Sequence, residues 1–422
     1  MTDVNKAWGA GPSERYDAIA EPFRPIFKRI GDTAIARETA RRLPYEEVLW
    51  LREAGFTTLR LPVEYGGPGI TLPELFALFI ELSEADPNLT NAFRSHFGFI
   101  EEVLDQKPSA WRDTWLGHIA AGEMAGSAGT ELGNQTLGKL STRLVRKGDR
   151  YVLNGEKYYT TGSIFADWLK ASADGEDGER FGVMVPTSAP GVEIIDDWDG
   201  FGQRLSASGT ARFNNVVLDP ELIRPTAGVF RYSGAFFQLV HLAELAGIGR
   251  AASSELATLV SERQRIYGGR SVSARPSEDP QLLQVVGRVR AASYSAGAIA
   301  IKATEALQRA ADLAHSTDEV ARKQAYTLAD LECSQSVTIV TDLIFEATTI
   351  LFDALGASAA KSELALDRHW RNARTISSHN PRVYHDRIVG DYAVNGTTPP
   401  AKGGVGVAAP PAKAPATAKE RA

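Results

Sequence analysis

The sequence predicts an α+β protein with three units in order along the chain: a helical N-terminal domain, a central antiparallel β domain and a C-terminal helical bundle. Apolar residues recur at three- and four-residue spacings before residue 123 and after residue 235, which is the pattern of amphipathic helices. Between these stretches, short alternating runs are separated by Gly, Pro and Asn, as in strands joined by turns. The length of 422 residues also exceeds the usual single domain, so several packed units are expected.

Residues 1–122 are expected to form the helical N-terminal domain. An amphipathic pattern runs through residues 13–51, and the later stretch LPVEYGGPGI is rich in Gly and Pro, which is typical of a loop. Thr71 and Glu74 then have the spacing of a capping box, with Pro73 in the first turn. The helix that follows, ELFALFIELSEA, is apolar over much of its surface and is therefore predicted to be buried.

Residues 123–230 are expected to form the β domain, a small barrel or sandwich of antiparallel strands. Turn signals occur at residues 147–149 (KGD) and at Asn154-Gly155. The stretches FGVMVP, GVEII and TARFNNVVL have the strand-like composition expected between such turns.

Residues 231–396 are expected to form the C-terminal bundle, because three long Ala-rich helical patterns follow one another there. The tail, residues 397–422, consists mostly of Pro, Ala, Gly and Lys without an aromatic residue. Such a composition cannot bury a core, so the tail is predicted to be disordered.

Composition excludes several classes of protein. Lys and Arg number 46 against 52 Asp and Glu, a net charge of −6 that disfavours a dedicated nucleic-acid binder. The single cysteine, Cys333, rules out an intramolecular disulfide and argues against a zinc site. No apolar run approaches the roughly 20 residues of a membrane helix, and the N-terminus lacks a signal-peptide pattern. The expectation is a cytoplasmic protein without a metal, nucleic-acid or membrane partner.

Five segments, taken in order over about residues 15–395, resemble the acyl-CoA dehydrogenase superfamily of flavoproteins: LPVEYGGPGI, GSAGTELGN, LNGEKYYTTGSIFADW, GFGQRLSASGTARFNNVVLDPELI and LDRHWRNART. The resemblance implies an acyl-CoA dehydrogenase-like fold with a C-terminal four-helix bundle. It also implies a homotetramer, a dimer of dimers assembled through that bundle.

The second and third of these segments resemble the flavin-contacting loops of the family. An isoalloxazine ring needs polar partners at its edge and apolar or aromatic cover on its faces, and the loops offer such residues. By resemblance, Tyr159 packs on the ring and Thr161 bonds near N5. The cofactor-binding residues expected here are Ser127, Thr130, Tyr159, Thr161 and Ser163. Each alone is also simply a good β former, so only the set together favours the flavin.

The dehydrogenases of the family carry a catalytic glutamate near the end of the C-terminal segment, whereas this sequence has no carboxylate between Asn372 and His385. The residues present, SHNP at 378–381, resemble the flavin-dependent monooxygenase branch, as do RSHFGF, DDWDGFGQR and RIVGDYAVNG. In that branch, reduced flavin and O₂ form a C4a-hydroperoxide, and one oxygen passes to sulfur or nitrogen. The resemblance makes His379, His96 and Asn380 the catalytic candidates.

His379 has an alternative role as the cap of a helix end. The sequence also has Ile376 where the branch carries a second histidine.

The resemblance favours FMN, as FMNH₂, over FAD. Family members that use FAD have a Gly-Gly-x-Gly turn where this chain has ALGASAAK, with Gly356 alone. Further cofactor contacts are expected from Trp198, Arg371 and Arg270, the last on the phosphate bound to a neighbouring subunit. The run GIGRAA at residues 247–252 lies in a helical pattern and does not indicate a Rossmann domain, so a separate NAD(P)H-dependent flavin reductase is expected.

The function expected is that of a two-component FMNH₂-dependent monooxygenase that uses O₂ to oxygenate sulfur or nitrogen in a small, mostly apolar substrate. Phe99, Phe236 and Phe237 are candidate walls of its pocket. Two alternatives stay open at this point: an FAD-dependent acyl-CoA dehydrogenase with its base elsewhere, and a non-catalytic member of the family.

Overall fold

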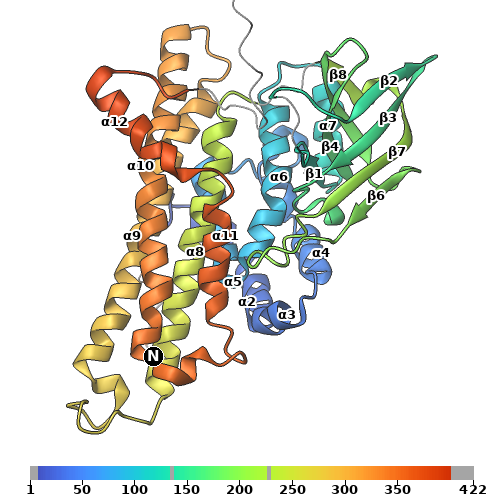
Figure 1. The fold of residues 1–422 in the computed structure, drawn as a ribbon. Helices are drawn as coiled ribbons and strands as arrows, with labels where there is room; N and C mark the ends of the chain where they lie inside the picture. Colours follow the sequence, from blue (N-terminus) through green and yellow to red (C-terminus); the bar gives the residue numbers. More distant parts are fainter. Residues whose placement is uncertain (1–7, 134–136, 226–229, 401–422) are drawn as a thin grey trace, which may run out of the picture.

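The computed structural model describes residues 8–133, 137–225 and 230–400, which form two helical regions with a sheet between them in the sequence (Figure 1). This arrangement confirms the predicted α+β fold class. Most of the predicted disordered tail, residues 401–422, lies outside the described residues.

The N-terminal region is helical, as predicted. Its helices are α1 (Tyr16–Ala20), α2 (Arg24–Asp32), α3 (Ala34–Ala40), α4 (Tyr45–Glu53), α5 (Leu72–Ala85), α6 (Pro87–Leu104) and α7 (Ala110–Ala120), with a short 3₁₀ turn, η2 (Phe56–Thr58). The predicted capping box begins α5: the Thr71 amide donates to Glu74 Oε2 (2.7 Å), and the Glu74 amide donates to Thr71 Oγ1 (3.4 Å). Helix α5 is buried over most of its length.

The central region is one sheet. Its strands are β1 (Ala125–Ala128), β2 (Arg143–Lys147), β3 (Arg150–Lys157), β4 (Trp168–Asp174), β5 (Arg180–Pro186), β6 (Val192–Ile195), β7 (Thr210–Leu218) and β8 (Ile223–Pro225). Their order is β6-β7-β3-β2-β4-β5-β8, with β1 beside β4. The pairing is antiparallel except where β1 and β2 meet β4. One face of the sheet buries its own apolar cluster, which includes Leu144, Leu153 and Phe213.

One of the two predicted turns is confirmed and the other is wrong. Gly148, with φ +66°, joins β2 to β3 in a tight hairpin. Asn154 and Gly155 instead lie inside β3, where the register against β7 shifts at a bulge. A Cβ on Gly155 would stand 2.6 Å from Thr142, so the glycine here permits a close approach between backbones.

The C-terminal region consists of the long helices α8 (Ser233–Glu262), α9 (Pro280–Asp312) and α10 (Glu319–Ile350), followed by α11 (Asp367–Ser377) and α12 (His385–Asn395). The GIGRAA run is helical, and its glycines allow close packing: a Cβ on Gly247 would stand 2.4 Å from Ser83, and one on Gly249 would stand 2.5 Å from Ile344. None of the helices in the described ranges combines the length and apolar character needed to cross a bilayer.

Helix α6 lies between the bundle and the sheet (Figure 1) and contacts both α8 and β1. The segments singled out from the sequence meet around this helix.

Candidate active site

The two predicted flavin loops lie side by side at the edge of the sheet. The Tyr158 amide donates to the Thr130 carbonyl (2.9 Å), and Ser163 Oγ donates to the Ser127 carbonyl (3.2 Å). The fold therefore brings Ser127, Thr130, Tyr159, Thr161 and Ser163 together, although they come from segments about thirty residues apart.

Tyr159 stands out in this group because its backbone has φ +60°, a left-handed conformation that is costly for a tyrosine. Its side chain is 49% exposed, and its ring centroid lies 6.2 Å from that of Trp198. Residues held in such conformations cluster at functional sites, where the surrounding structure enforces them. Tyr159 and Trp198 thus place two aromatic rings beside the loops.

A chain of hydroxyl groups fixes the second loop to the segment before β7. Thr161 Oγ1 and Ser208 Oγ lie 2.8 Å apart, and Ser208 Oγ and Ser206 Oγ lie 2.7 Å apart. Gly162 packs directly on α6: a Cβ at this position would stand 2.1 Å from the Ala92 carbonyl oxygen. These contacts fix the position of the loop against α6.

On the bundle side, the segment after α11 is attached to α8. Asn380 Nδ2 donates to Gln238 Oε1 (2.9 Å), and the ring centroids of His379 and His241 lie 4.5 Å apart. His379 is exposed, whereas His241 is 1% exposed. Two histidines thus lie together here, and the second one comes from α8 and not from the position of Ile376.

Several buried polar atoms around α6 have no hydrogen-bond partner among the described residues. They are Asn91 Oδ1, Arg94 Nε, Gln203 Nε2, Glu244 Oε1 and Oε2, and Thr375 Oγ1. These atoms come from α6, α8, α11 and the segment before β7, and two of their residues are joined by a bond from Asn91 Nδ2 to Gln203 Oε1 (3.1 Å). Because buried polar groups are satisfied as a rule, such a concentration indicates ligand-binding groups. The donors and acceptors present suit a flavin ring and a polar substrate.

His96 does not have the catalytic geometry expected from the sequence. It is fully buried, its Nε2 donates to the Thr57 carbonyl (2.8 Å), and its Nδ1 accepts from the Ala125 amide (3.2 Å). Burial lowers the pKa of His96 to about 4. Both ring nitrogens are used by the backbone, so His96 connects α6 to η2 and β1 and has no nitrogen left for a reacting group.

Arg371 is also occupied elsewhere. Its Nη1 donates to Glu38 Oε1 (2.7 Å) and to the Phe201 carbonyl (2.9 Å), and its Nε donates to Asp367 (2.7 Å). The Phe201 contact supports the segment that carries Trp198. These bonds give Arg371 a role in positioning that segment, and the cofactor contact expected from the sequence stays a prediction.

Arg270 lies in the loop after the C-terminal end of α8. His241 precedes that end by about 20 residues, or roughly 30 Å of helix. With Arg263 and Arg265 it lines a cavity of about 250 Å³. Within one chain, Arg270 is not brought to the flavin loops.

The three residues predicted to line the substrate pocket, Phe99, Phe236 and Phe237, lie in different surroundings. Phe99 packs on Trp111 and Trp115, and Phe236 packs on Phe76 and Phe230, all as parts of the apolar core. The half-buried Phe237 instead faces α6, where a Cβ on Gly98 would stand 2.4 Å from its ring.

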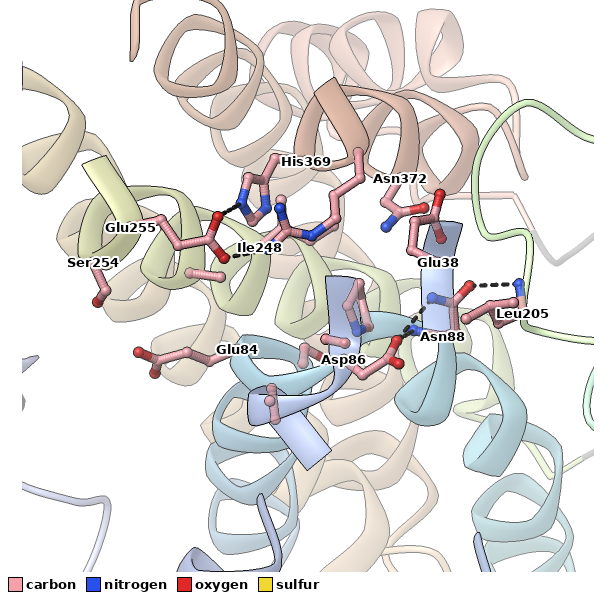
Figure 2. A pocket seen from close by; sticks show the side chains of 17 residues that line it. Glu38, Glu84, Asp86, Asn88, Leu205, Ile248, Ser254, Glu255, His369 and Asn372 are labelled. Atoms are coloured by element: carbon pink, nitrogen blue, oxygen red, sulfur yellow. Dashed lines mark hydrogen bonds and ion pairs between the residues drawn. The ribbon is translucent and has the colours of Figure 1, made fainter. Parts of the chain in front are cut away.

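A separate cavity of about 220 Å³ lies toward the opposite end of α11 from His379, between that helix, α8 and the turn joining α5 to α6 (Figure 2). Glu255 there accepts from His369 (3.0 Å) and pairs with Arg368. Burial raises the pKa of Glu84 in its wall to about 7. Asn372 and Leu205 line this cavity and link it to the segment that holds Gln203.

The sequence interpretation missed Arg94, His241, Glu244, Asn91 and Gln203. A signal existed for the two on α8, since a histidine and a glutamate three residues apart interrupt an apolar helix face in VHLAEL. Arg94 is the first residue of the RSHFGF segment, but the direction of its side chain depends on how α6 packs against α8.

Comparison with known families and proteins agrees with the fold. Three acyl-CoA dehydrogenase domain families match: the N-terminal domain over residues 14–123, the middle domain over 126–216 and the C-terminal domain over 239–382. A dibenzothiophene monooxygenase of Mycolicibacterium goodii is 26% identical over 94% of this chain and 98% of its own. A probable FMNH₂-dependent monooxygenase, SfnC, of Pseudomonas putida is 27% identical over 89% and 94%.

Among solved structures, TdsC from Paenibacillus sp. A11-2 in complex with FMN and indole superposes with a TM-score of 0.83 at 26% identity. It covers 92% of this chain and 99% of its own.

Proposed function

The chain belongs to the acyl-CoA dehydrogenase family, and from this premise we propose that it is a two-component monooxygenase that uses FMNH₂. The observation that carries the proposal is the group of unsatisfied buried polar atoms on α6 and α8. The second flavin loop packs on α6 at Ala92, α8 holds His241 beside His379, and the sequence has no carboxylate between Asn372 and His385. The relatives named for FMNH₂-dependent oxygenation match along nearly the whole chain.

The overall reaction balances as follows: FMNH₂, O₂ and the substrate give FMN, water and a substrate with one added oxygen on sulfur or nitrogen. Bound FMNH₂ would supply the two electrons that activate O₂. Tyr159 and Trp198 would cover the ring, and the hydroxyls of Thr161 and Ser163 would meet its polar edge. His379, held beside His241, is the candidate to keep a proton at the reacting oxygen.

Glu244 is the carboxyl that a dehydrogenase would have to use as its base. It is fully buried, and burial raises its pKa well above the ordinary value, although Arg94 opposes this effect. Burial thus favours the protonated form of Glu244, and a protonated carboxyl does not act as a base. The site therefore favours oxygenation over removal of an α-proton from an acyl thioester.

The partners follow from the cofactor. No segment indicates a nicotinamide-binding domain, so a separate flavin reductase is proposed to supply FMNH₂. We assign Arg270 to the flavin phosphate of a neighbouring subunit in a homotetramer, because it lies too far along α8 to reach the loops of its own chain.

Stopped-flow absorbance tests the proposal. Protein loaded anaerobically with FMNH₂ is mixed with O₂, and the expected result is the absorbance of a C4a-hydroperoxyflavin that decays more slowly than with free FMNH₂. A dehydrogenase would instead copurify with FAD, and an acyl-CoA thioester would bleach it under anaerobic conditions. Bleaching of that kind would contradict the proposal.

A further inference from the structure

Arg94 differs from the other buried arginines, Arg37 and Arg368, in lacking an ion-pair partner among the described residues. Its residue is 8% exposed, and its Nε has no hydrogen-bond partner within the described chain. The Nε of Arg37 is also without a partner, but its Nη1 and Nη2 form ion pairs with Glu47 (3.0 Å) and Asp86 (2.8 Å), and the half-buried Arg60 pairs with Glu101 (2.7 Å). Buried charges are almost always paired, so the exception at Arg94 needs an explanation.

Glu244 is the carboxyl whose charge acts on Arg94, but the two side chains do not form a hydrogen-bonded ion pair. Neither of its oxygens makes a hydrogen bond with a described residue. Burial raises the pKa of Glu244 well above its ordinary value, which favours the protonated form of this carboxyl. The guanidinium thus stays a buried cation without a bonded anion, and burial lowers the pKa of Arg94 itself.

Arg94 belongs to the same site as His379. The Arg94 guanidinium lies 5.6 Å from the ring centroid of Phe237, and its charge interacts with Glu244. Phe237, His241 and Glu244 are spaced by four and three residues on α8, so they share one face of that helix. His379 contacts this face at His241. A ligand on this face would therefore have the Arg94 cation, the Phe237 ring and the histidine pair within its reach.

We propose that Arg94 binds an anionic group of the substrate, a carboxylate, sulfinate or sulfonate. The substrate class is then a small organic acid that carries an oxidisable sulfur or nitrogen, in place of the small, mostly apolar compound expected from the sequence. The oxygenation of this substrate rests on the proposed monooxygenase function. The binding of its anionic group rests only on the environment of Arg94. A guanidinium suits such oxyanions because it can donate two parallel hydrogen bonds to them.

Binding of a matched pair of probes tests the anion site without catalysis. The probes are 3-(methylthio)propanoate and its neutral amide, titrated calorimetrically into the full-length protein loaded with oxidised FMN. The acid is expected to bind at least tenfold more tightly than the amide. Arg94→Gln should remove that preference, Arg94→Lys should keep part of it, and Arg288→Gln, which alters an exposed ion pair with Glu346, should leave it unchanged.

Equal binding of acid and amide, or an undiminished preference in Arg94→Gln, would overturn the proposal. If Arg94→Gln does not fold, the two probes are compared on Arg94→Lys, because a lysine offers a point charge without the paired donors. A reduced preference for the acid would support the proposal, and an undiminished one would contradict it. Oxygenation is measured separately as sulfoxide formed with FMNH₂ and O₂. A retained acid preference without sulfoxide would contradict the monooxygenase function and leave the anion site standing.

Discussion

At the residue scale, His379 is the group on which, in the proposed function, productive oxygen transfer depends. It is exposed at the end of α11 and contacts His241 on α8. His379→Ala is expected to uncouple the reaction, so that H₂O₂ replaces most of the oxygenated product, because proton control at the reacting oxygen is lost. The ratio of H₂O₂ to product per NADH consumed measures this in a coupled reductase assay.

The control for that variant is His315→Ala, since His315 lies at the surface and bonds the Leu104 carbonyl (3.3 Å). The ratio of H₂O₂ to oxygenated product should be the same in His315→Ala as in the parent protein. Unchanged coupling in His379→Ala would remove this residue from the mechanism.

The buried, unpaired charge of Arg94 is expected to lower the stability of the protein while serving to bind the substrate. Replacing a buried, unpaired guanidinium with an apolar side chain of similar length removes a desolvated charge. Arg94→Met is therefore expected to raise the free energy of unfolding by about 1–2 kcal/mol while abolishing the preference for acidic probes. Urea unfolding monitored by circular dichroism checks the stability, and a loss of stability without bound ligand would show that the guanidinium is satisfied in the native protein.

His96 predicts a dependence of stability on pH. Its folded-state pKa of about 4 lies below the ordinary value of 6.5, so between these values the unfolded chain takes up a proton that the native protein does not. Stability is therefore lost as pH falls from 6.5 toward 4. Between pH 7 and pH 5 the parent protein should lose about 2 kcal/mol more than His96→Gln.

That comparison uses the difference between the two proteins because Glu84, with a raised pKa of about 7, acts in the opposite direction over part of the same range. Parallel curves for the two proteins would show that His96 is not held neutral.

At the scale of single elements, the loop after β3 depends on Gly162. The residue has φ +74°, and a Cβ there would stand 2.1 Å from the Ala92 carbonyl oxygen. Gly162→Ala is expected to cost more than 2 kcal/mol of stability and to weaken FMN binding, because the loop must move off α6. Gly148→Ala is the matched control, since Gly148 also has a positive φ (+66°) but has open space around it. Thermal unfolding and fluorescence titration with FMN measure the two effects, and equal losses in both variants would contradict the steric account.

Particular elements show which features of the structure could be predicted from the sequence. The capping box of α5, the hairpin at Gly148 and the two flavin loops depend on local residue patterns, so they could be predicted. His96 could not, because its role depends on the contacts of α6 with η2 and β1. His241 and Arg94 were missed for a related reason: their partners come from helices distant in the chain, and no periodicity shows which way they face.

At the scale of the whole molecule, Arg270 tests whether the flavin site spans two subunits. Arg270→Gln is expected to weaken FMN binding about tenfold or more, as for loss of a charge-assisted bond, whereas Arg146→Gln, at an exposed residue of β2, should not. Mixing Arg270→Gln subunits with Tyr159→Ala subunits should restore part of the FMN sites, because one intact loop would then face one intact arginine. Absence of any restoration would place the phosphate site within a single chain.

In the proposed function, the three regions form one catalytic unit to which the flavin loops, α6, α8 and the end of α11 each contribute residues. Its reactivity would come from the flavin, with the chain supplying position, cover and protons. The test of this account is the source of the added oxygen. Under ¹⁸O₂, with FMNH₂ supplied by a separate reductase, the account predicts one ¹⁸O atom in the oxygenated product by mass spectrometry; oxygen derived from water, or an unsaturated acyl thioester as product, would contradict it.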